Sequence, residues 1–339
     1  MTDDQGIFYD RTPALSHNAV ITMCTGMRGG GKTFSYKEWC ITDPSYSFVW
    51  VRRYDTELKK CEKTFLGDMI QEKVIAPESV KDWKLQGHTL YYKDRPKGYF
   101  IALSKQAIEK SGSFHQVDKI VFDECFLKPH GSHRYLNDEV EMFLELMETV
   151  NRLRLDGRRE VRAVLIGNKT SYLNPWFAYY GIKPFDGRFR WAPGKKGLVL
   201  VENYTNEKFS EIKRHTKFGR LIDGTKYGDY AIENEAWFDD GDAFITKKPN
   251  KCQPILTITY HGKRYGVWSD SETVYVGESF VSNVNLAGSI DDMTEEIQIS
   301  FVTLRKLRAN YENGSLRFRD VNTKFEILDM LQRYASLKR

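Results

Sequence analysis

The residue spacing with the clearest chemical meaning lies between Gly26 and Thr33. This segment fits the pattern G-x-x-x-x-G-K-[ST], with Gly26, Gly31, Lys32 and Thr33 at the fixed positions. Glycines let successive backbone amides turn inward around phosphate oxygens, a conformation that a Cβ atom would obstruct. The lysine of the pattern reaches the β- and γ-phosphates, and the hydroxyl coordinates Mg²⁺. We therefore predict a nucleoside triphosphate site formed by Gly26, Arg28, Gly29, Gly30, Gly31, Lys32 and Thr33.

The segments on either side of this loop support the prediction. Residues 18–25 form an apolar run that is typical of a buried strand, and the residues that follow Lys32 are compatible with a helix. Such a helix would direct its positive end at the bound phosphates. A strand, a glycine-rich loop and a helix in this order favour a phosphate site over an ordinary turn.

An acidic pair, Asp123 and Glu124, ends a second apolar run that begins at residue 119. An aspartate at the carboxyl end of such a strand holds Mg²⁺ opposite the loop hydroxyl, here Thr33. The adjacent glutamate can polarise an attacking water molecule. Together with the loop, the pair predicts an ATPase that hydrolyses ATP with Mg²⁺, with Thr33 and Asp123 as the metal-binding residues.

Asn168 ends the next predicted strand, residues 162–168. In P-loop ATPases with an additional strand, a polar residue at this place senses the γ-phosphate and the attacking water, although asparagine also ends strands in ordinary turns. We favour the first interpretation. The segment that begins at Asn168 differs from the guanine-binding pattern N-K-x-D at Ser171, so we expect ATP rather than GTP.

Strands separated by helices predict a three-layer α/β domain with a mostly parallel sheet. The expected strands are residues 47–53, 99–103, 119–124 and 162–168, and the expected helix is residues 137–154. A turn-rich break follows at residues 191–197. Beyond it we expect a helix at residues 206–216, a hairpin at residues 255–268, a strand at residues 273–277 and helices near residues 292–311 and 322–336. The predicted domains are residues 1–192, a linker with short helices at residues 193–234, and a smaller α+β domain at residues 235–339.

Composition excludes several classes of protein. No apolar run is long enough to span a membrane and the polar start is not a signal peptide, so we expect no membrane partner. The five scattered cysteines suggest neither a zinc site nor disulfides, which favours a reducing compartment. Residues 301–339 carry nine basic and four acidic side chains, while the rest of the chain is neutral. Such a tail is compatible with a polyanionic partner and equally with a solvated helical face.

Several blocks of sequence together resemble the DNA-packaging (encapsidation) ATPase of small podophages that replicate by protein priming. The blocks run in order over nearly the whole chain, at residues 27–33, 51–54, 120–124, 147–152, 174–177 and 218–225. The block at residues 218–225 and the context of Arg152 are the most specific, because many unrelated proteins share the phosphate loop. This family is related to the large terminases and to additional-strand P-loop ATPases.

The resemblance implies a homopentameric ring, attached to the portal vertex of an empty procapsid in the host cytoplasm and absent from the mature virion. The ring would hydrolyse ATP to drive double-stranded DNA inward. Glu124 would be the catalytic carboxylate, Arg152 an arginine finger acting on the neighbouring subunit, and Lys110 a second such cation. Spacing alone does not distinguish Arg152 and Lys110 from ordinary surface cations. The family anchors its ring with the help of a structural RNA, and the sequence leaves open whether this chain uses one.

Large terminases carry a metal-dependent nuclease of the RNase H-like fold as their second domain, and residues 243–280 fit a reduced version of it. That chemistry needs carboxylates that converge on two metal ions. The expected first strand, residues 244–248, offers none, and the acidic residues Asp239, Asp240, Asp242 and Asp270 lie at apparent turns. We therefore expect a vestigial nuclease domain for docking and nucleic-acid contact. The alternative is a complete terminase with an active nuclease.

Overall fold

The fold was analysed in a computed structural model of the chain, which separates into two compact units. The first unit comprises Met1–Leu127, Glu139–Thr170 and Lys183–Trp237, and the second comprises Lys128–Asp138, Ser171–Ile182 and Phe238–Arg339. Within these ranges the structure describes residues 6–43, 45–105, 114, 116–127, 135–136, 138–151, 160–170, 174–182, 185–232, 244–260, 262–279, 287–289, 301–320, 323–324, 326–328 and 330–331.

The first unit is built on a nine-stranded sheet among its described residues, with the order β3-β4-β5-β2-β6-β7-β1-β9-β8. The six neighbouring strands from β5 to β9 pair in parallel, and only the outer strands are antiparallel. The strands are β1 (Ile21–Gly26), β2 (Ser47–Arg52), β3 (Trp83–Gln86), β4 (Thr89–Tyr92), β5 (Arg95–Ala102), β6 (Val117–Phe122), β7 (Arg162–Ile166), β8 (Phe189–Trp191) and β9 (Val199–Tyr204).

The position of β7 confirms the predicted fold class. This strand lies between β1, which leads into the glycine-rich loop, and β6, which leads into Asp123. Val164 of β7 is aligned with Thr22 on one side and with Val121 on the other. An additional strand between these two elements defines the additional-strand P-loop ATPases, and the mostly parallel sheet agrees with the prediction.

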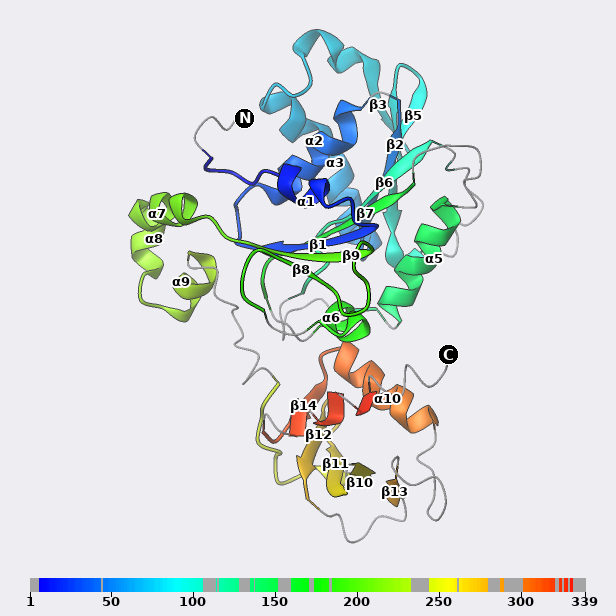
Figure 1. The fold of residues 1–339 in the computed structure, drawn as a ribbon, viewed down its shortest axis with the longest axis vertical. Coiled ribbons are helices and arrows are strands. Elements are labelled where there is room, and N and C mark those ends of the chain that lie inside the picture. The colour runs from blue at the N-terminus through cyan, green and yellow to red at the C-terminus, as the bar shows by residue number, and fades with distance from the viewer. Residues whose placement is uncertain are drawn as a thin grey trace. The chain divides into compact units, whose positions relative to one another are not determined.

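Helices cover both faces of this sheet and make a three-layer domain (Figure 1). On one face, α2 (Lys32–Thr42) and α3 (Asp55–Gln71) share a core with the strands. On the other face, α5 (Glu139–Asn151) contacts β6, where the rings of Phe143 and Phe122 stack with centroids 5.7 Å apart. The shorter helices of this part are α1 (Thr12–Ser16), η1 (Pro77–Asp82) and η2 (Leu103–Lys105).

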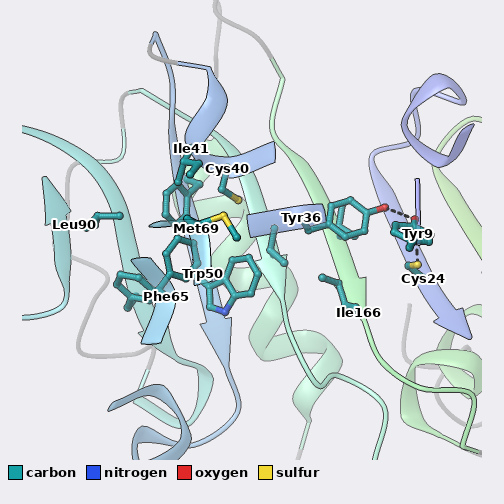
Figure 2. Close-up of a cluster of buried hydrophobic side chains, with 14 of the residues drawn as sticks. Tyr9, Cys24, Tyr36, Cys40, Ile41, Trp50, Phe65, Met69, Leu90 and Ile166 are labelled. Carbon is teal, nitrogen blue, oxygen red and sulfur yellow. Dashed lines mark hydrogen bonds between the residues drawn. The ribbon is translucent and has the colours of Figure 1, made fainter. Parts of the chain in front are cut away.

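Aromatic rings form the centre of the core between α3 and the sheet. Phe65 of α3 is fully buried and contacts Trp50, Phe48 and Phe100, with centroid distances of 5.1, 5.5 and 5.2 Å. Figure 2 shows Trp50, Phe65 and Met69 side by side in this cluster. Edge-to-face and stacked pairs of this kind stabilise the packing of α3 by about 0.5–1.5 kcal/mol each beyond the area that they bury.

The sheet continues past residue 192, where the sequence predicts the end of the first domain. β9 pairs with β1 over six aligned residues and β8 covers the edge of β9, because a buried central strand needs hydrogen-bonding partners on both sides. After β9 the chain forms the short helices α7 (Glu207–His215), α8 (Lys217–Ile222) and α9 (Lys226–Ala231) (Figure 1). The side chains of Asn206, Thr216 and Thr225 cap their first turns.

The second unit has the predicted α+β character. Its described strands form a five-stranded sheet of order β13-β10-β11-β12-β14 around the predicted hairpin. Residues 244–248, expected as a strand, pair only at a single bridge between Ile245 and Phe318. The elements are α6 (Pro175–Tyr180), β10 (Gln253–Tyr260), β11 (Lys263–Ser269), β12 (Val274–Glu278), β13 (Ala287–Ser289), α10 (Phe301–Glu312) and β14 (Leu316–Phe318). Its expected relation to RNase H-like nucleases stays a prediction.

In the part of the chain that the structure describes, no helix combines the length and the apolar character that a bilayer crossing requires.

Replacing Phe65 with alanine should lower the free energy of unfolding by about 3–5 kcal/mol, because the change leaves a cavity among three other rings. Urea denaturation followed by circular dichroism measures the loss. The control is Phe218→Ala on α8, where the side chain is 50% exposed, and its effect should stay within about 0.5 kcal/mol. Equal losses in the two variants would contradict the assigned core.

Candidate nucleotide-binding and hydrolysis site

The backbone of the loop after β1 has the conformation that glycine permits. Gly31, directly before α2, has φ 91°, and Gly29 has φ 82°, both in the left-handed region. At Gly26 the close approach of β9 adds a second constraint, since a Cβ atom there would lie 2.4 Å from the Tyr204 carbonyl oxygen. The glycines thus let the loop curl between β1 and α2, which gives the amide cradle that phosphate binding requires.

Lys32 is buried at the first position of α2. Its ammonium donates a hydrogen bond to the Met27 carbonyl within the loop, at 2.6 Å. Burial lowers the pKa of Lys32 to about 8, and the neighbouring carboxylates of Glu202 and Asp123 oppose this shift. A buried cation with one carbonyl partner is poorly solvated, so a phosphate group in the loop would stabilise it.

Thr33 and Asp123 lie together as the sequence predicts. The Thr33 hydroxyl donates to the Asp123 carboxylate at 3.0 Å, although 90 residues separate them in the chain. One carboxylate and one hydroxyl suit Mg²⁺, which takes few protein ligands and completes its shell with substrate phosphates and water. The described residues include no group of three His, Cys, Asp or Glu side chains that could hold a metal ion alone. The pair of Thr33 and Asp123 thus suits a metal that substrate phosphates and water also coordinate.

Arg52, at the end of β2, joins the two acidic residues of the site. Its guanidinium contacts Asp123 Oδ2 at 3.0 Å and Glu124 Oε2 at 3.1 Å. Burial raises the pKa of the Asp123 carboxyl, and the charge of Arg52 opposes this effect. Sequence reasoning did not assign Arg52 to the site. The sequence did hold a signal for this role, namely a cation at the carboxyl end of an apolar strand. Burying a charge there costs free energy unless a carboxylate pairs with it.

Glu124 projects from the strand end into solvent, with 66% of its side chain exposed. Its backbone has φ 55°, in the left-handed region that a residue with a side chain rarely adopts. Arg53 supports this turn, since its guanidinium donates to the carbonyls of Glu124 and Cys125 at 3.2 and 2.7 Å. The predicted catalytic carboxylate is therefore held at a strained turn beside Asp123, where it can reach a solvent molecule.

Arg53 also forms a buried ion pair with Glu139, the first residue of α5. Arg53 Nε and one terminal nitrogen bind the two carboxylate oxygens at 2.6 and 2.9 Å, and both side chains are almost completely buried. The planar guanidinium matches the carboxylate with two parallel hydrogen bonds. This pair connects the turn at Glu124 to the start of α5. The helix ends at Asn151, directly before the predicted arginine finger Arg152 in the sequence.

Asn168 lies beside the loop. The amide of the next residue, Lys169, donates to the Gly26 carbonyl at 3.0 Å. The segment after β7 is therefore hydrogen-bonded to the first residue of the loop. Burial raises the pKa of Tyr230 on α9, and the charge of Arg28 and, to a smaller extent, the nearby Asn168 side chain oppose this shift. Asn168 thus lies between the loop and the helices after β9, a place that is compatible with the predicted sensing role.

Tyr9 fastens the loop to the sheet, and sequence reasoning did not identify it. Its amide donates to the Gly30 carbonyl at 2.8 Å, and its hydroxyl donates to Glu202 at 2.7 Å and lies 2.9 Å from the Tyr36 hydroxyl. Arg188 neutralises the buried Glu202 at 2.8 Å. Figure 2 shows Tyr9 between Tyr36 and Cys24, whose thiol also donates to it. Local sequence holds no signal for this network, because its members lie far apart in the chain.

Arg28 is exposed on the loop, and its carbonyl accepts a hydrogen bond from Lys213 of α7 at 3.1 Å. The predicted cations Lys110 and Arg152 lie outside the described residues. The structure thus brings Lys32, Thr33, Asp123, Glu124 and Asn168 to one edge of the sheet, beside the glycines of the loop.

A family model described as podovirus DNA encapsidation protein (Gp16) matches residues 3–334. The chain belongs to this family. The DNA packaging protein of Bacillus phage B103 is 34% identical over 316 residues, which cover 90% of this chain and 94% of the relative. The DNA packaging protein of Bacillus phage phi29 is 31% identical over 327 residues, covering 93% and 94% of the two chains.

Solved structures of this family share the fold. A chain of the phi29 viral genome packaging motor assembly is 31% identical, with a TM-score of 0.56 and coverage of 97% of this chain and 99% of the other. The N-terminal domain of the phi29 DNA packaging ATPase is 29% identical, with a TM-score of 0.50, and covers 59% of this chain and 97% of its own. The predicted family and its packaging function are thereby confirmed.

Replacing Glu139 with glutamine should lower the free energy of unfolding by about 3–5 kcal/mol, because the change leaves the Arg53 charge buried without its counter-ion. Urea denaturation measures the loss. Glu148→Gln on the same helix is the matched control, since that carboxylate is exposed. A loss no larger than that of the control would show that the pair does not hold α5 to the strand end.

Proposed function

We propose that this chain is the ATP-hydrolysing subunit of a motor that drives double-stranded DNA into a procapsid. Family membership supports packaging, and the contact between Thr33 and Asp123 beside the buried Lys32 is the observation that carries the ATPase assignment. In this proposal Lys32, Thr33 and Asp123 bind Mg-ATP, whereas Glu124 polarises the attacking water. All of these residues lie at the same edge of the sheet.

Each residue at this edge has a separate role in the proposal. The loop amides and Lys32 bind the phosphates, and Thr33 and Asp123 would hold Mg²⁺. A metal ion bound there would supply positive charge to the transferring phosphoryl group. Glu124 accepts a proton from the attacking water, for which its carboxylate must face the water instead of Arg52. Asn168 orients the water or the γ-phosphate.

The assembly is proposed as a homopentameric ring on the portal of the procapsid, in the host cytoplasm. In this ring Arg152 and Lys110 reach the nucleotide of the neighbouring subunit and stabilise the transition-state charge. Contact with DNA is mainly to phosphates, hence independent of sequence and weakened by salt. A structural packaging RNA is a further candidate partner at the same vertex.

Residues 235–339 are proposed as a docking and nucleic-acid-contacting module derived from a nuclease. The alternative, an active metal-dependent nuclease, is not favoured. Asp270 accepts hydrogen bonds from the amides of Glu272 and Thr273 at 2.9 and 2.7 Å, so it stabilises a turn. Asp239, Asp240 and Asp242 lie outside the described residues.

Replacing Glu124 with glutamine should reduce DNA-stimulated ATP hydrolysis on portal-bearing procapsids about 10²–10⁴-fold, because the general base is lost. ATP binding should stay within about threefold, since the phosphate contacts remain. Phosphate release and titration calorimetry measure the two quantities. Glu78→Gln, at an exposed carboxylate of η1, is the control and should change neither. Unchanged hydrolysis in the Glu124 variant would contradict the catalytic assignment.

Mixed rings test action between subunits. Arg152→Ala subunits and Lys32→Ala subunits should each be inactive alone, and mixtures should recover part of the hydrolysis, because an intact site then receives an intact arginine from its neighbour. The recovery should peak at intermediate ratios. Activity that stays at the level of the separate variants at every ratio would show that Arg152 does not act in trans.

A further inference from the structure

Two phenylalanine rings lie against the outer side of the phosphate loop. A Cβ atom at Gly31 would lie 3.6 Å from Cβ of Phe8, and one at Gly29 would lie 3.7 Å from Cζ of Phe209. The two rings also contact each other, with centroids 6.3 Å apart and planes inclined by 57°. The two rings come from segments that lie about 200 residues apart in the chain. Each ring packs against the loop at a glycine, which has no side chain of its own to fill the space.

The two segments are fastened to each other. The Asn206 side chain donates to the carbonyls of Gly6 and Ile7 at 2.9 and 3.1 Å. Its oxygen accepts from the Phe209 amide at 3.1 Å and caps α7. A single side chain therefore sets both the path of residues 6–8 and the start of the helix that carries Phe209.

The same two segments are also attached to the loop itself. Next to Phe8, the Tyr9 amide binds the Gly30 carbonyl, and one turn after Phe209, Lys213 binds the Arg28 carbonyl at 3.1 Å. The ammonium of Lys213 lies 5.6 Å from the centroid of the Phe209 ring. The rings therefore keep their positions relative to the phosphate site.

Both rings remain only half-buried, although a phenylalanine gains most by complete burial. The loop encloses the phosphates of a nucleotide, so its ribose and base must lie outside the loop. A planar base needs a flat apolar surface there, and an aromatic ring at a fixed place supplies one at little cost in conformational entropy. The side-chain atoms nearest to a Cβ atom placed on Gly29 or Gly31 belong to these two phenylalanines, and the Tyr9 amide nitrogen lies 3.8 Å from the one on Gly31.

We propose that Phe8 and Phe209 bind the aromatic base of the nucleoside triphosphate. The inference rests on the proposed function of the loop and deepens it. The base stacks on the rings while the loop and Lys32 hold the phosphates. Stacking supplies affinity more than selectivity, because every base has a π-face. Since Phe209 lies on α7, the bound nucleotide also connects the N-terminal segment, the loop and the helices after β9.

The test separates the base from the phosphates. Phe8→Ala and Phe209→Ala should each weaken ATP binding at least about fivefold in the full-length chain, as expected for the loss of one stacking partner. Binding of inorganic tripolyphosphate, which has no base, should be unchanged. Titration calorimetry measures both affinities. Phe8→Tyr and Phe209→Tyr should retain ATP binding, because they keep a flat ring.

A spectroscopic readout accompanies these titrations. The fluorescence of 2-aminopurine riboside triphosphate should be quenched on binding to the unmodified chain and less so on binding to the alanine variants. Phe218→Ala is the matched control, since its ring contacts Tyr227 on α9, and it should behave like the unmodified chain.

Three results would count against the proposal or its basis. Equal weakening of ATP and tripolyphosphate would mean that the rings only support the loop, and unchanged ATP binding would place the base elsewhere. Both results overturn the base site and leave the phosphate site intact. If Lys32→Ala bound both ligands like the unmodified chain, the proposed function of the loop itself would fail, whatever the phenylalanine variants do.

Discussion

The site depends on the position of β1, which is fixed because this strand pairs in parallel with a neighbour on each side. β1 is hydrogen-bonded to β7 on one side and to β9 on the other, and every one of its residues is buried. Its carboxyl end is therefore fixed, and the loop begins at a defined point. Parallel neighbours end at the same edge of the sheet, so the residues at or just beyond the ends of β2, β6 and β7 gather around that point. Arg52, Asp123 and Asn168 lie together for this reason.

Charge at this edge is balanced by cations from the neighbouring strand. Arg52 faces the two acidic residues after β6, and Arg53 points the other way, into the pair with Glu139. Adjacent residues of a strand project to opposite faces, so two consecutive arginines serve both sides of the sheet. One neutralises the carboxylates of the site and the other holds the turn that presents Glu124. Neither arginine would tolerate its degree of burial without a carboxylate partner.

Sequence reasoning succeeded where the chemistry is local. The glycines, Lys32 and Thr33 are neighbours in the chain, and Asp123 and Asn168 were found because each ends an apolar run. The additional-strand class was predicted from Asn168 after the strand that follows Asp123, and the place of that strand between β1 and β6 came only from the structure. Reasoning of this kind missed contacts between distant residues, such as the bond from Tyr9 to Glu202, 193 positions away. It also ended the first domain before β9, because the turn-rich segment at residues 191–197 looks like a boundary and only pairing with β1 shows that the sheet continues.

The attachment of Tyr9 to the loop has a practical consequence for protein engineering. A recombinant form that began after this residue would keep the whole pattern from Gly26 to Thr33 and would still match any motif search. It would nevertheless lack the amide that holds the Gly30 carbonyl and the hydroxyl that covers Glu202. Retention of a motif is therefore a poor guide to how far this polypeptide can be shortened, and the amino-terminal side is the wrong one from which to trim it.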